Sequence, residues 1–236
     1  MSALRARISA LVSEFDLPEG SGRALRALLE AVEGDPTAPT TVTDPVLGVE
    51  VHVADALDGL RLDVVRAATR VADLGAGAGF PGLVLAVARP EAQLWLVESV
   101  GRKCAFIRRA AALAGLTNVE AVHARAEDWA EGLAAHDLVT ARALAPLAVL
   151  VEYAAPLLAM GGHLVAWKGT RDATEEADAL AAGAATGLAA RTVLAVPARP
   201  GADHRHLHVY AKVGETPARF PRRPGMARKR PLSAGG

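Results

Sequence analysis

The sequence predicts an α/β fold built on a mainly parallel β-sheet with helices on both faces. From Arg70 onward, short apolar runs alternate with alanine-rich stretches of helical spacing, which is the pattern of parallel strands joined by helices. Near the end of the chain, two strand-like runs follow each other directly, at 191–196 and 206–213. Because no helix separates them, we expect the last connection of the sheet to be an antiparallel hairpin.

Residues 1–60 are predicted to form a small helical N-terminal extension. Leucine and valine recur there at helical spacing up to Gly34-Asp35-Pro36, which ends the first helix. A loop rich in proline and threonine, 37–43, leads into a second helical stretch. In that stretch His52 and Asp55 lie three residues apart and therefore on one face.

The sheet-forming domain is expected to span 61–214. Its strands are predicted at 71–74, 93–98, 118–123, 137–140 and 161–168, ahead of the two final ones, with helices at 82–88, 102–114, 146–160 and 172–186. Pro146 suits the first turn of its helix, because that turn leaves its N–H groups unbonded.

Composition excludes several classes of protein. The chain has 236 residues, 51% of them hydrophobic, and 26 basic against 26 acidic side chains, which is not the composition of a disordered chain. Cys104 is the only cysteine, so a disulfide scaffold is excluded. The most apolar stretch, 144–151, is far shorter than the roughly 20 residues of a membrane span, and the N-terminus lacks a signal-peptide pattern. We expect a cytoplasmic globular protein.

The C-terminal tail, residues 215–236, is strongly basic. It carries six arginine and lysine side chains against the single acid Glu215, and the three prolines of its stretch 220–231 prevent a regular helix or central strand. The tail is either an arm for nucleic-acid phosphates or a solvated segment without a partner. We expect binding of a cofactor at the sheet not to depend on the tail, and Phe220 and the prolines leave open the alternative that the tail packs over the site.

The sharpest motif is the glycine loop Asp73-Leu-Gly-Ala-Gly-Ala-Gly-Phe-Pro-Gly82, which follows the first predicted strand. Glycines at 75 and 77 let the backbone approach a ligand closely. Gly77, Gly79 and Gly82 also satisfy the dinucleotide pattern G-x-G-x-x-G, which keeps NAD open as a ligand. Glu98 ends the next strand, where an acid accepts hydrogen bonds from the ribose hydroxyls of either kind of nucleoside cofactor.

From about residue 40 onward, the chain resembles the bacterial small-subunit ribosomal RNA guanine-N7 methyltransferases, once called glucose-inhibited division protein B. The resemblance implies a class I S-adenosylmethionine-dependent methyltransferase, a Rossmann-like fold whose seven-stranded sheet has an antiparallel last strand. The blocks that carry it are Asp73–Gly82, Arg89-Pro90-Glu91, Glu98-Ser99 with Arg102-Lys103 and Phe106, Arg125-Ala126-Glu127, Ala141-Arg142-Ala143, Lys168-Gly169, Arg205-His206-Leu207 and Phe220–Gly225.

The resemblance also implies the site. S-adenosylmethionine is expected to contact Gly75, Phe80, Ala126, Glu127 and Arg142, with Glu98 on the ribose and Gly77 beside the methionine portion. Glu98 stands where the family more often has aspartate.

The implied activity is methylation of N7 of a guanosine in 16S ribosomal RNA, near the decoding region. Guanine N7 carries a free lone pair and no proton, so the enzyme needs to position the base but needs neither a general base nor a covalent intermediate. Arg142 and Lys168, at the ends of the fourth and fifth strands, are the candidate positioning residues. Their alternative role is structural ion pairing.

The expected partner is 16S ribosomal RNA or a small-subunit assembly intermediate, with no membrane, no metal ion and a monomeric enzyme. RNA phosphates are expected to contact Arg102, Lys103, Arg222, Arg223, Arg228, Lys229 and Arg230.

Other functions stay open at this point. The chain could methylate a small molecule or another RNA, act as an NAD-dependent oxidoreductase, or be a catalytically silent RNA-binding factor. Cys104 lies inside a helix without a catalytic pattern, so we interpret it as a packed thiol rather than a nucleophile. His204, His206 and His208 alternate along a predicted strand and would share one face, but we favour a chain without a metal site.

Overall fold

The computed structural model describes residues 2–200 and 203–235, and its centre is one seven-stranded sheet in the order β3-β2-β1-β4-β5-β7-β6. Strands β1 to β5 are mutually parallel where they pair, whereas β7 runs antiparallel to both β5 and β6. The mainly parallel sheet and its final hairpin are therefore confirmed. The strands are β1 (Arg70–Leu74), β2 (Gln93–Glu98), β3 (Val119–His123), β4 (His136–Arg142), β5 (Leu158–Lys168), β6 (Leu188–Ala195) and β7 (His206–Lys212).

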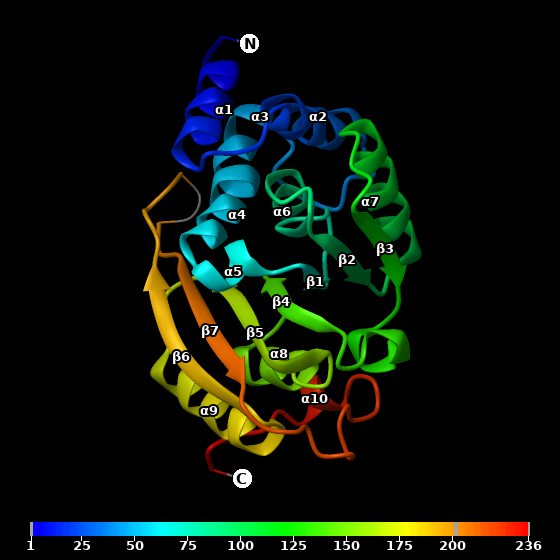
Figure 1. Cartoon of the computed structure of the whole chain (residues 1–236), viewed down its shortest axis with the longest axis vertical. Coiled ribbons are helices and arrows are strands. Elements are labelled where there is room, and N and C mark those ends of the chain that lie inside the picture. Colours follow the sequence, from blue (N-terminus) through cyan, green and yellow to red (C-terminus); the bar gives the residue numbers. More distant parts are fainter. Residues whose placement is uncertain (1, 201–202, 236) are drawn as a thin grey trace.

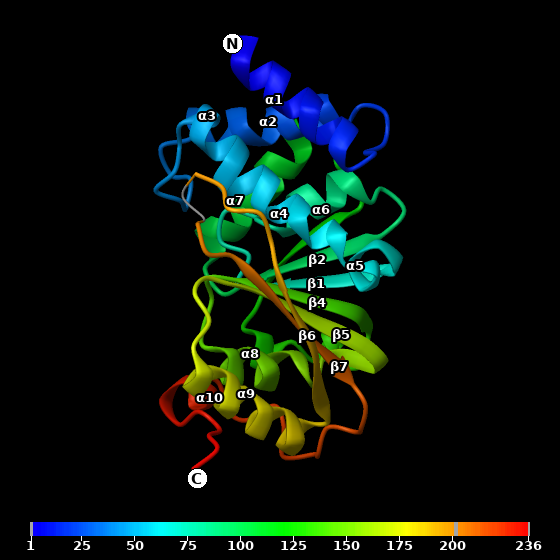
Figure 2. The same cartoon turned by 90° about the vertical axis from the view of Figure 1, so that its left-hand side faces the viewer.

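One face of the sheet carries the N-terminal helices together with α6 and α7, as Figure 2 shows with the sheet seen from its side. Leu25, Leu57, Leu83 and Phe106 are all buried in one core on this face, so the N-terminal extension packs directly onto the sheet domain. The helices are α1 (Ser2–Glu14), α2 (Ser21–Gly34), α3 (Pro45–Gly48), α4 (Asp55–Leu57), α5 (Asp63–Ala67), α6 (Gly82–Ala88) and α7 (Gly101–Leu113), and a π-helical segment (Val49–Ala54) joins α3 to α4.

The opposite face carries α8 (Leu147–Ala154) and α9 (Ala173–Thr186), with the short α10 (Met226–Lys229) of the C-terminal tail beside them (Figure 1). Every residue of α8 is buried, because the helix is covered by the sheet, by α9 and by the tail. Ala227 of α10 is only 1% exposed and belongs to the same core. The tail is therefore packed against the domain.

Two details of the sequence-based prediction are wrong. The helix that begins after Pro146 ends at Ala154 and does not reach Met160, because Pro156 has no N–H with which to continue the helical hydrogen bonds. The freed segment extends β5, which begins at Leu158.

The three histidines near 206 do not share one strand face. Strand β7 begins at His206, so His204 lies before it, and His208 is buried while His206 approaches the carbonyl oxygen of Gly169 at 2.9 Å. Within residues 2–200 and 203–235, no three His, Cys, Asp or Glu side chains are grouped so that they could hold a metal ion. None of the described helices is long and apolar enough to cross a membrane.

Candidate active site

The glycine loop leaves β1 at the carboxyl edge of the parallel strands, where open α/β sheets bind their ligands. Gly75, Gly77 and Gly79 all adopt positive φ angles, of 64°, 57° and 90°. A Cβ atom at Gly75 would collide with the side chain of Leu144, whereas one at Gly77 would find nothing closer than the Gly75 carbonyl oxygen at 3.8 Å. The loop thus follows a path that favours glycine and leaves open space beside Gly77.

Asp73 stabilises the glycine loop through the hydrogen bonds of its carboxylate. Its carboxylate accepts a hydrogen bond from the Thr140 hydroxyl at 2.8 Å and another from the Gly82 amide at 3.0 Å. Burial raises the pKa of Asp73 to about 6, although both hydrogen bonds act in the opposite direction. The side chain therefore connects β1, β4 and the start of α6 as a structural support of the loop.

Glu98, predicted to bind the ribose, lies at the end of β2 and is 5% exposed. Its carboxylate accepts hydrogen bonds from the amides of Gly77 at 3.1 Å and Val100 at 2.9 Å. Because a carboxylate offers about four acceptor positions, capacity remains for ribose hydroxyls. The side chain thus connects the glycine loop to the loop after β2.

A pocket of about 250 Å³ opens at this edge, close to the lower end of the roughly 300–1,000 Å³ of small-molecule sites. Of the predicted cofactor residues, Gly75, Ala126 and Glu127 line it, whereas Gly77, Phe80, Glu98 and Arg142 lie outside this lining. The remaining lining residues are Val97, Ser99, Ala124, Arg125, Leu144, Tyr153 and Arg228. This pocket and the open space at Gly77 are therefore the candidate site for the nucleoside part of the predicted cofactor.

Phe80 faces the N-terminal region. Its ring stacks on the imidazole of His52, with the ring centres 4.6 Å apart and the planes within 6° of parallel. The His52 Nε2 lies 3.0 Å from the Val42 carbonyl oxygen, to which it donates, and the buried Nδ1 has no partner among the described residues. Burial lowers the pKa of His52, so the ring is neutral at pH 7.

Asp55 holds two arginines of the sheet edge. One carboxylate oxygen accepts from Arg142 at 2.7 Å, the other from Arg205 at 2.6 Å, and Arg142 also donates to the Val51 carbonyl oxygen. The guanidinium of Arg142 lies 6.0 Å from the centre of the Phe80 ring. The ion pair that we considered for Arg142 is therefore present, and it fixes the guanidinium beside Phe80.

Lys168, the second candidate positioning residue, lies at the end of β5. Its ammonium group is 2.6 Å from a carboxylate oxygen of Glu175 on α9, and the same oxygen accepts from the Leu147 amide. Lys168 is thus also ion-paired, and its partner Glu175 joins α9 to the start of α8.

The C-terminal tail reaches the pocket, which is the alternative that Phe220 and the prolines left open. Arg222 forms a two-pronged ion pair with Glu152 of α8, whose side chain is 2% exposed. The Gly225 amide donates to the Glu127 carboxylate at 2.9 Å, and Arg228 donates to the Leu144 carbonyl oxygen at 2.8 Å.

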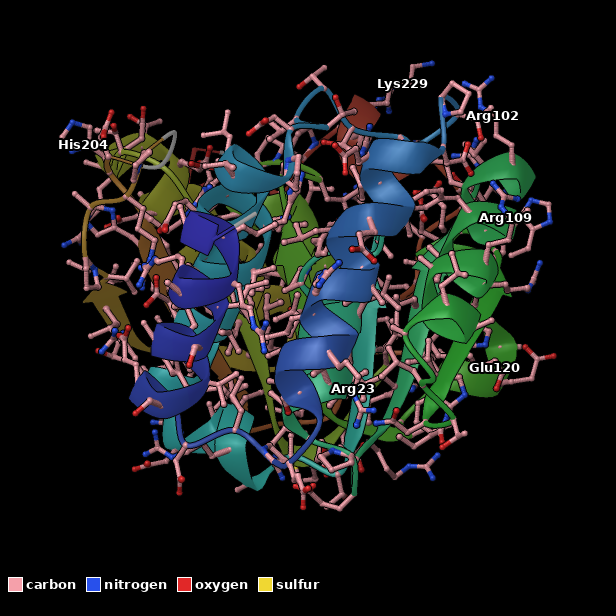
Figure 3. The ribbon with its side chains drawn as sticks, turned by 90° about the horizontal axis from the view of Figure 1, so that it is seen from above. Arg23, Arg102, Arg109, Glu120, His204 and Lys229 are labelled. Carbon is pink, nitrogen blue, oxygen red and sulfur yellow. The ribbon has the colours of Figure 1, made fainter. Side chains whose placement is uncertain are left out.

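The other predicted RNA-binding residues lie on α7 and on the tail around α10. Figure 3 shows Arg102, at the start of α7, and Lys229, on α10, projecting from the same side of the molecule. The ammonium group of Lys103 lies 3.8 Å from a carboxylate oxygen of Glu98, so Lys103 points toward the predicted ribose-binding residue. Arg223 and Arg230 are exposed.

The sequence did not reveal Leu144 and Tyr153 as pocket residues. Both lie in an apolar stretch that is typical of a core helix, and only the packing brings them to the glycine loop and to Glu127.

Burial raises the pKa of Cys104, and its thiol lies 3.2 Å from the Glu98 carbonyl oxygen, as suits a packed thiol.

Comparison with known proteins agrees with this geometry. A family model described as rRNA small subunit methyltransferase G matches residues 40–207. The ribosomal RNA small subunit methyltransferase G of Rubrobacter xylanophilus is 45% identical over 193 residues, which cover 78% of this chain and 73% of the relative. That of Pelotomaculum thermopropionicum is 39% identical and covers 77% of each chain.

Solved structures share the fold. A SAM-dependent methyltransferase from Aquifex aeolicus superposes with a TM-score of 0.55 at 14% identity, covering 78% of this chain and 98% of that one. Pyrococcus horikoshii TYW2, solved in complex with MeSAdo, gives 0.50 at 17% identity over 65% of this chain and 62% of its own. The expected class I methyltransferase fold is confirmed.

Proposed function

Because the chain belongs to the ribosomal RNA small subunit methyltransferase G family, we propose that it methylates N7 of one guanosine in 16S ribosomal RNA. It is a methyltransferase, and its cofactor is S-adenosylmethionine. Family membership removes the oxidoreductase alternative. In our proposal the target lies near the decoding region, in naked RNA or in an assembly intermediate, and the enzyme acts as a cytoplasmic monomer.

The placement of Arg142 is the observation that carries this proposal. Asp55 and the Val51 carbonyl oxygen hold its NH1 group, which leaves the other N–H donors of the guanidinium available beside Phe80. An arginine fork bonds guanine O6 or N7, and a bond to O6 leaves the N7 lone pair free for methylation. Arg142 would thus act as a positioning residue for the base.

The proposed chemistry requires no proton transfer by the protein. Bound S-adenosylmethionine supplies a methyl group already activated by its sulfonium centre. The protein then has to hold N7 in line with that methyl group and exclude water. The buried stack of His52 and Phe80 lies next to Arg142 and supports it, and Lys168 keeps N–H donor capacity for an RNA phosphate after pairing with Glu175.

The test measures transfer of a labelled methyl group to small subunits and to naked 16S ribosomal RNA, both isolated from cells that lack this gene. Mass mapping then locates the modified nucleotide and atom. Arg142→Lys keeps the charge but loses the planar fork, so methylation should fall strongly while the protein stays folded. Arg70→Lys is the matched control, because Arg70 begins β1 at the opposite edge of the sheet.

Three outcomes would contradict the proposal. Methylation of a different base atom would remove the N7 assignment. Cofactor binding without transfer to 16S ribosomal RNA would favour another RNA or a small-molecule substrate. Binding of RNA without cofactor binding would favour the catalytically silent factor.

A further inference from the structure

We propose that the C-terminal tail is the outer wall of the cofactor pocket and that Arg228 is a cofactor-positioning residue. This inference rests on the assignment of S-adenosylmethionine to the pocket at the glycine loop. It gives the tail a role in cofactor binding that is separate from any contact with RNA.

Separating the tail from the domain would expose buried groups, and this exposure costs free energy. Glu152 is buried in α8, and among the described residues Arg222 of the tail alone neutralises it, through hydrogen bonds from both Nε and NH2. Ala227 is buried against α8, and Leu232 packs against the same core. A charged group in such a position needs its partner, so the docked arrangement is strongly favoured over a free tail.

Two contacts bring the docked tail to the pocket. Gly225, in a left-handed conformation with φ of 78°, points its amide at the carboxylate of Glu127. Three residues later, Arg228 bonds the carbonyl oxygen of Leu144, the residue whose side chain packs against Gly75. The tail therefore joins the turn after β3 to the loop after β4, which are two sides of the pocket.

The chemistry of this wall suits an adenine nucleoside. Arg228 and Tyr153 both line the pocket, and burial raises the pKa of the Tyr153 phenol, which keeps it protonated as a donor. A guanidinium is planar and stacks on aromatic faces, so Arg228 would cover the purine ring and order it against Ala126. Glu127, already fixed by Gly225, keeps acceptor capacity for donors of the ligand.

The decisive experiment is calorimetric titration of the full-length protein with S-adenosylhomocysteine and with S-adenosylmethionine, in the absence of RNA. Arg228→Ala should raise the Kd of both by about tenfold, the effect of losing a charged contact in the site. Lys229→Ala, the neighbouring residue on the same short helix, projects outward and should leave both values within about twofold. Equal affinities for wild type and Arg228→Ala would overturn the proposal.

A variant at the glycine loop separates this proposal from the site assignment. If Gly77→Val abolishes cofactor binding while Arg228→Ala changes nothing, only the role of the tail is wrong. If both variants bind normally, the pocket itself is wrongly assigned. Thermal unfolding without ligand should give Arg228→Ala a Tm near that of wild type, because Arg228 is an exposed residue with one bond to a loop.

Limited digestion with trypsin provides a readout that involves no variant. If the tail helps to bind the cofactor, the cofactor must stabilise the docked tail by the same factor. Saturating S-adenosylhomocysteine should therefore slow cleavage after Arg228 and Lys229 by about tenfold, while cleavage after the exposed Arg5 of α1 provides the internal reference. Unchanged cleavage of the tail relative to Arg5 would contradict the proposal.

Discussion

Arg142 at the end of β4 donates to the carboxylate of Asp55 at 2.7 Å, across 87 residues of sequence. Asp55 is 1% exposed and also accepts from Arg205, which precedes β7. A residue of the N-terminal region therefore determines where two arginines of the sheet edge can lie. In the proposed site, the helical extension thus holds the guanidinium that we assign to the base.

Replacing Asp55 with asparagine should destabilise the protein. The variant keeps the shape of the side chain but leaves two arginines without their buried counter-charge, and breaking such a pair costs about 3–5 kcal/mol. Urea unfolding followed by circular dichroism measures this. Asp63→Asn removes an exposed carboxylate that pairs with Arg66 on the surface, and it should leave the free energy of unfolding close to that of wild type.

Asp73 should make stability depend on pH between about 4 and 6. Its pKa rises from 3.8 to about 6 on folding, so the folded state binds a proton that the unfolded state has released. The contribution of Asp73 is therefore fully present below about pH 4 and is lost as the pH rises through 6, by about 3 kcal/mol. The difference in unfolding free energy between wild type and Asp73→Asn, measured across this range, should show that slope.

Thr140→Val tests how the hydrogen bond from Thr140 affects the pKa of Asp73. It removes the hydroxyl that donates to Asp73, so the pKa of Asp73 should rise further in a carbon-detected NMR titration of the carboxylate. A pKa near 4 in the wild-type protein would contradict the role of burial.

Gly77→Val should abolish cofactor binding without removing the fold. The new side chain would enter the open space that we assign to the cofactor, and a valine at φ of 57° adds backbone strain of about 1–2 kcal/mol. Gly115→Val is the matched control, because Gly115 has φ of 70°, lies at the end of α7 away from the pocket, and would place its new Cβ with no atom within 4 Å. Both variants should lose similar stability, and only the first should lose calorimetric binding.

Single charge removals should divide the basic residues into two groups. Arg102→Ala and Lys229→Ala should each flatten the dependence of log K for single-stranded RNA on log[salt] by about 0.7, because each side chain is exposed and can neutralise a phosphate. Arg222→Ala should leave the slope unchanged and instead lower stability, because its charge is committed to Glu152. An equal loss of slope in all three would mean that the tail leaves α8 when RNA binds.

Local sequence predicted the first half of the sheet closely. The helix at 82–88 and the strand at 93–98 match α6 and β2, because each is an apolar run bounded by glycine, proline or charged residues. The helix after Pro146 was extended too far, since the apolar run continues through Pro156 and periodicity alone does not separate a buried helix from a buried strand.

The candidate site was only partly predictable. The local sequence pattern predicts the glycine loop and Glu98 as site elements. In the structure, the amide of Gly77 in this loop donates a hydrogen bond to the Glu98 carboxylate. The partners of Arg142, Arg222 and Arg228 lie on elements distant in sequence, and a basic residue alone does not show whether it faces an acid, a carbonyl oxygen or a phosphate. Those assignments depend on tertiary packing.

The ion pairs of Asp55 have a consequence for the order in which the protein folds. They close loops of 87 and 150 residues, whereas the contacts between β1 and β2 join segments only 23 residues apart. Contacts with large sequence separation carry the larger loop-closure entropy, so the sheet can nucleate before the arginines meet Asp55. Interactions absent from the folding transition state act mainly on the unfolding rate. We therefore expect the sheet edge that carries Arg142 to be completed late in folding, and its ion pairs with Asp55 to slow unfolding.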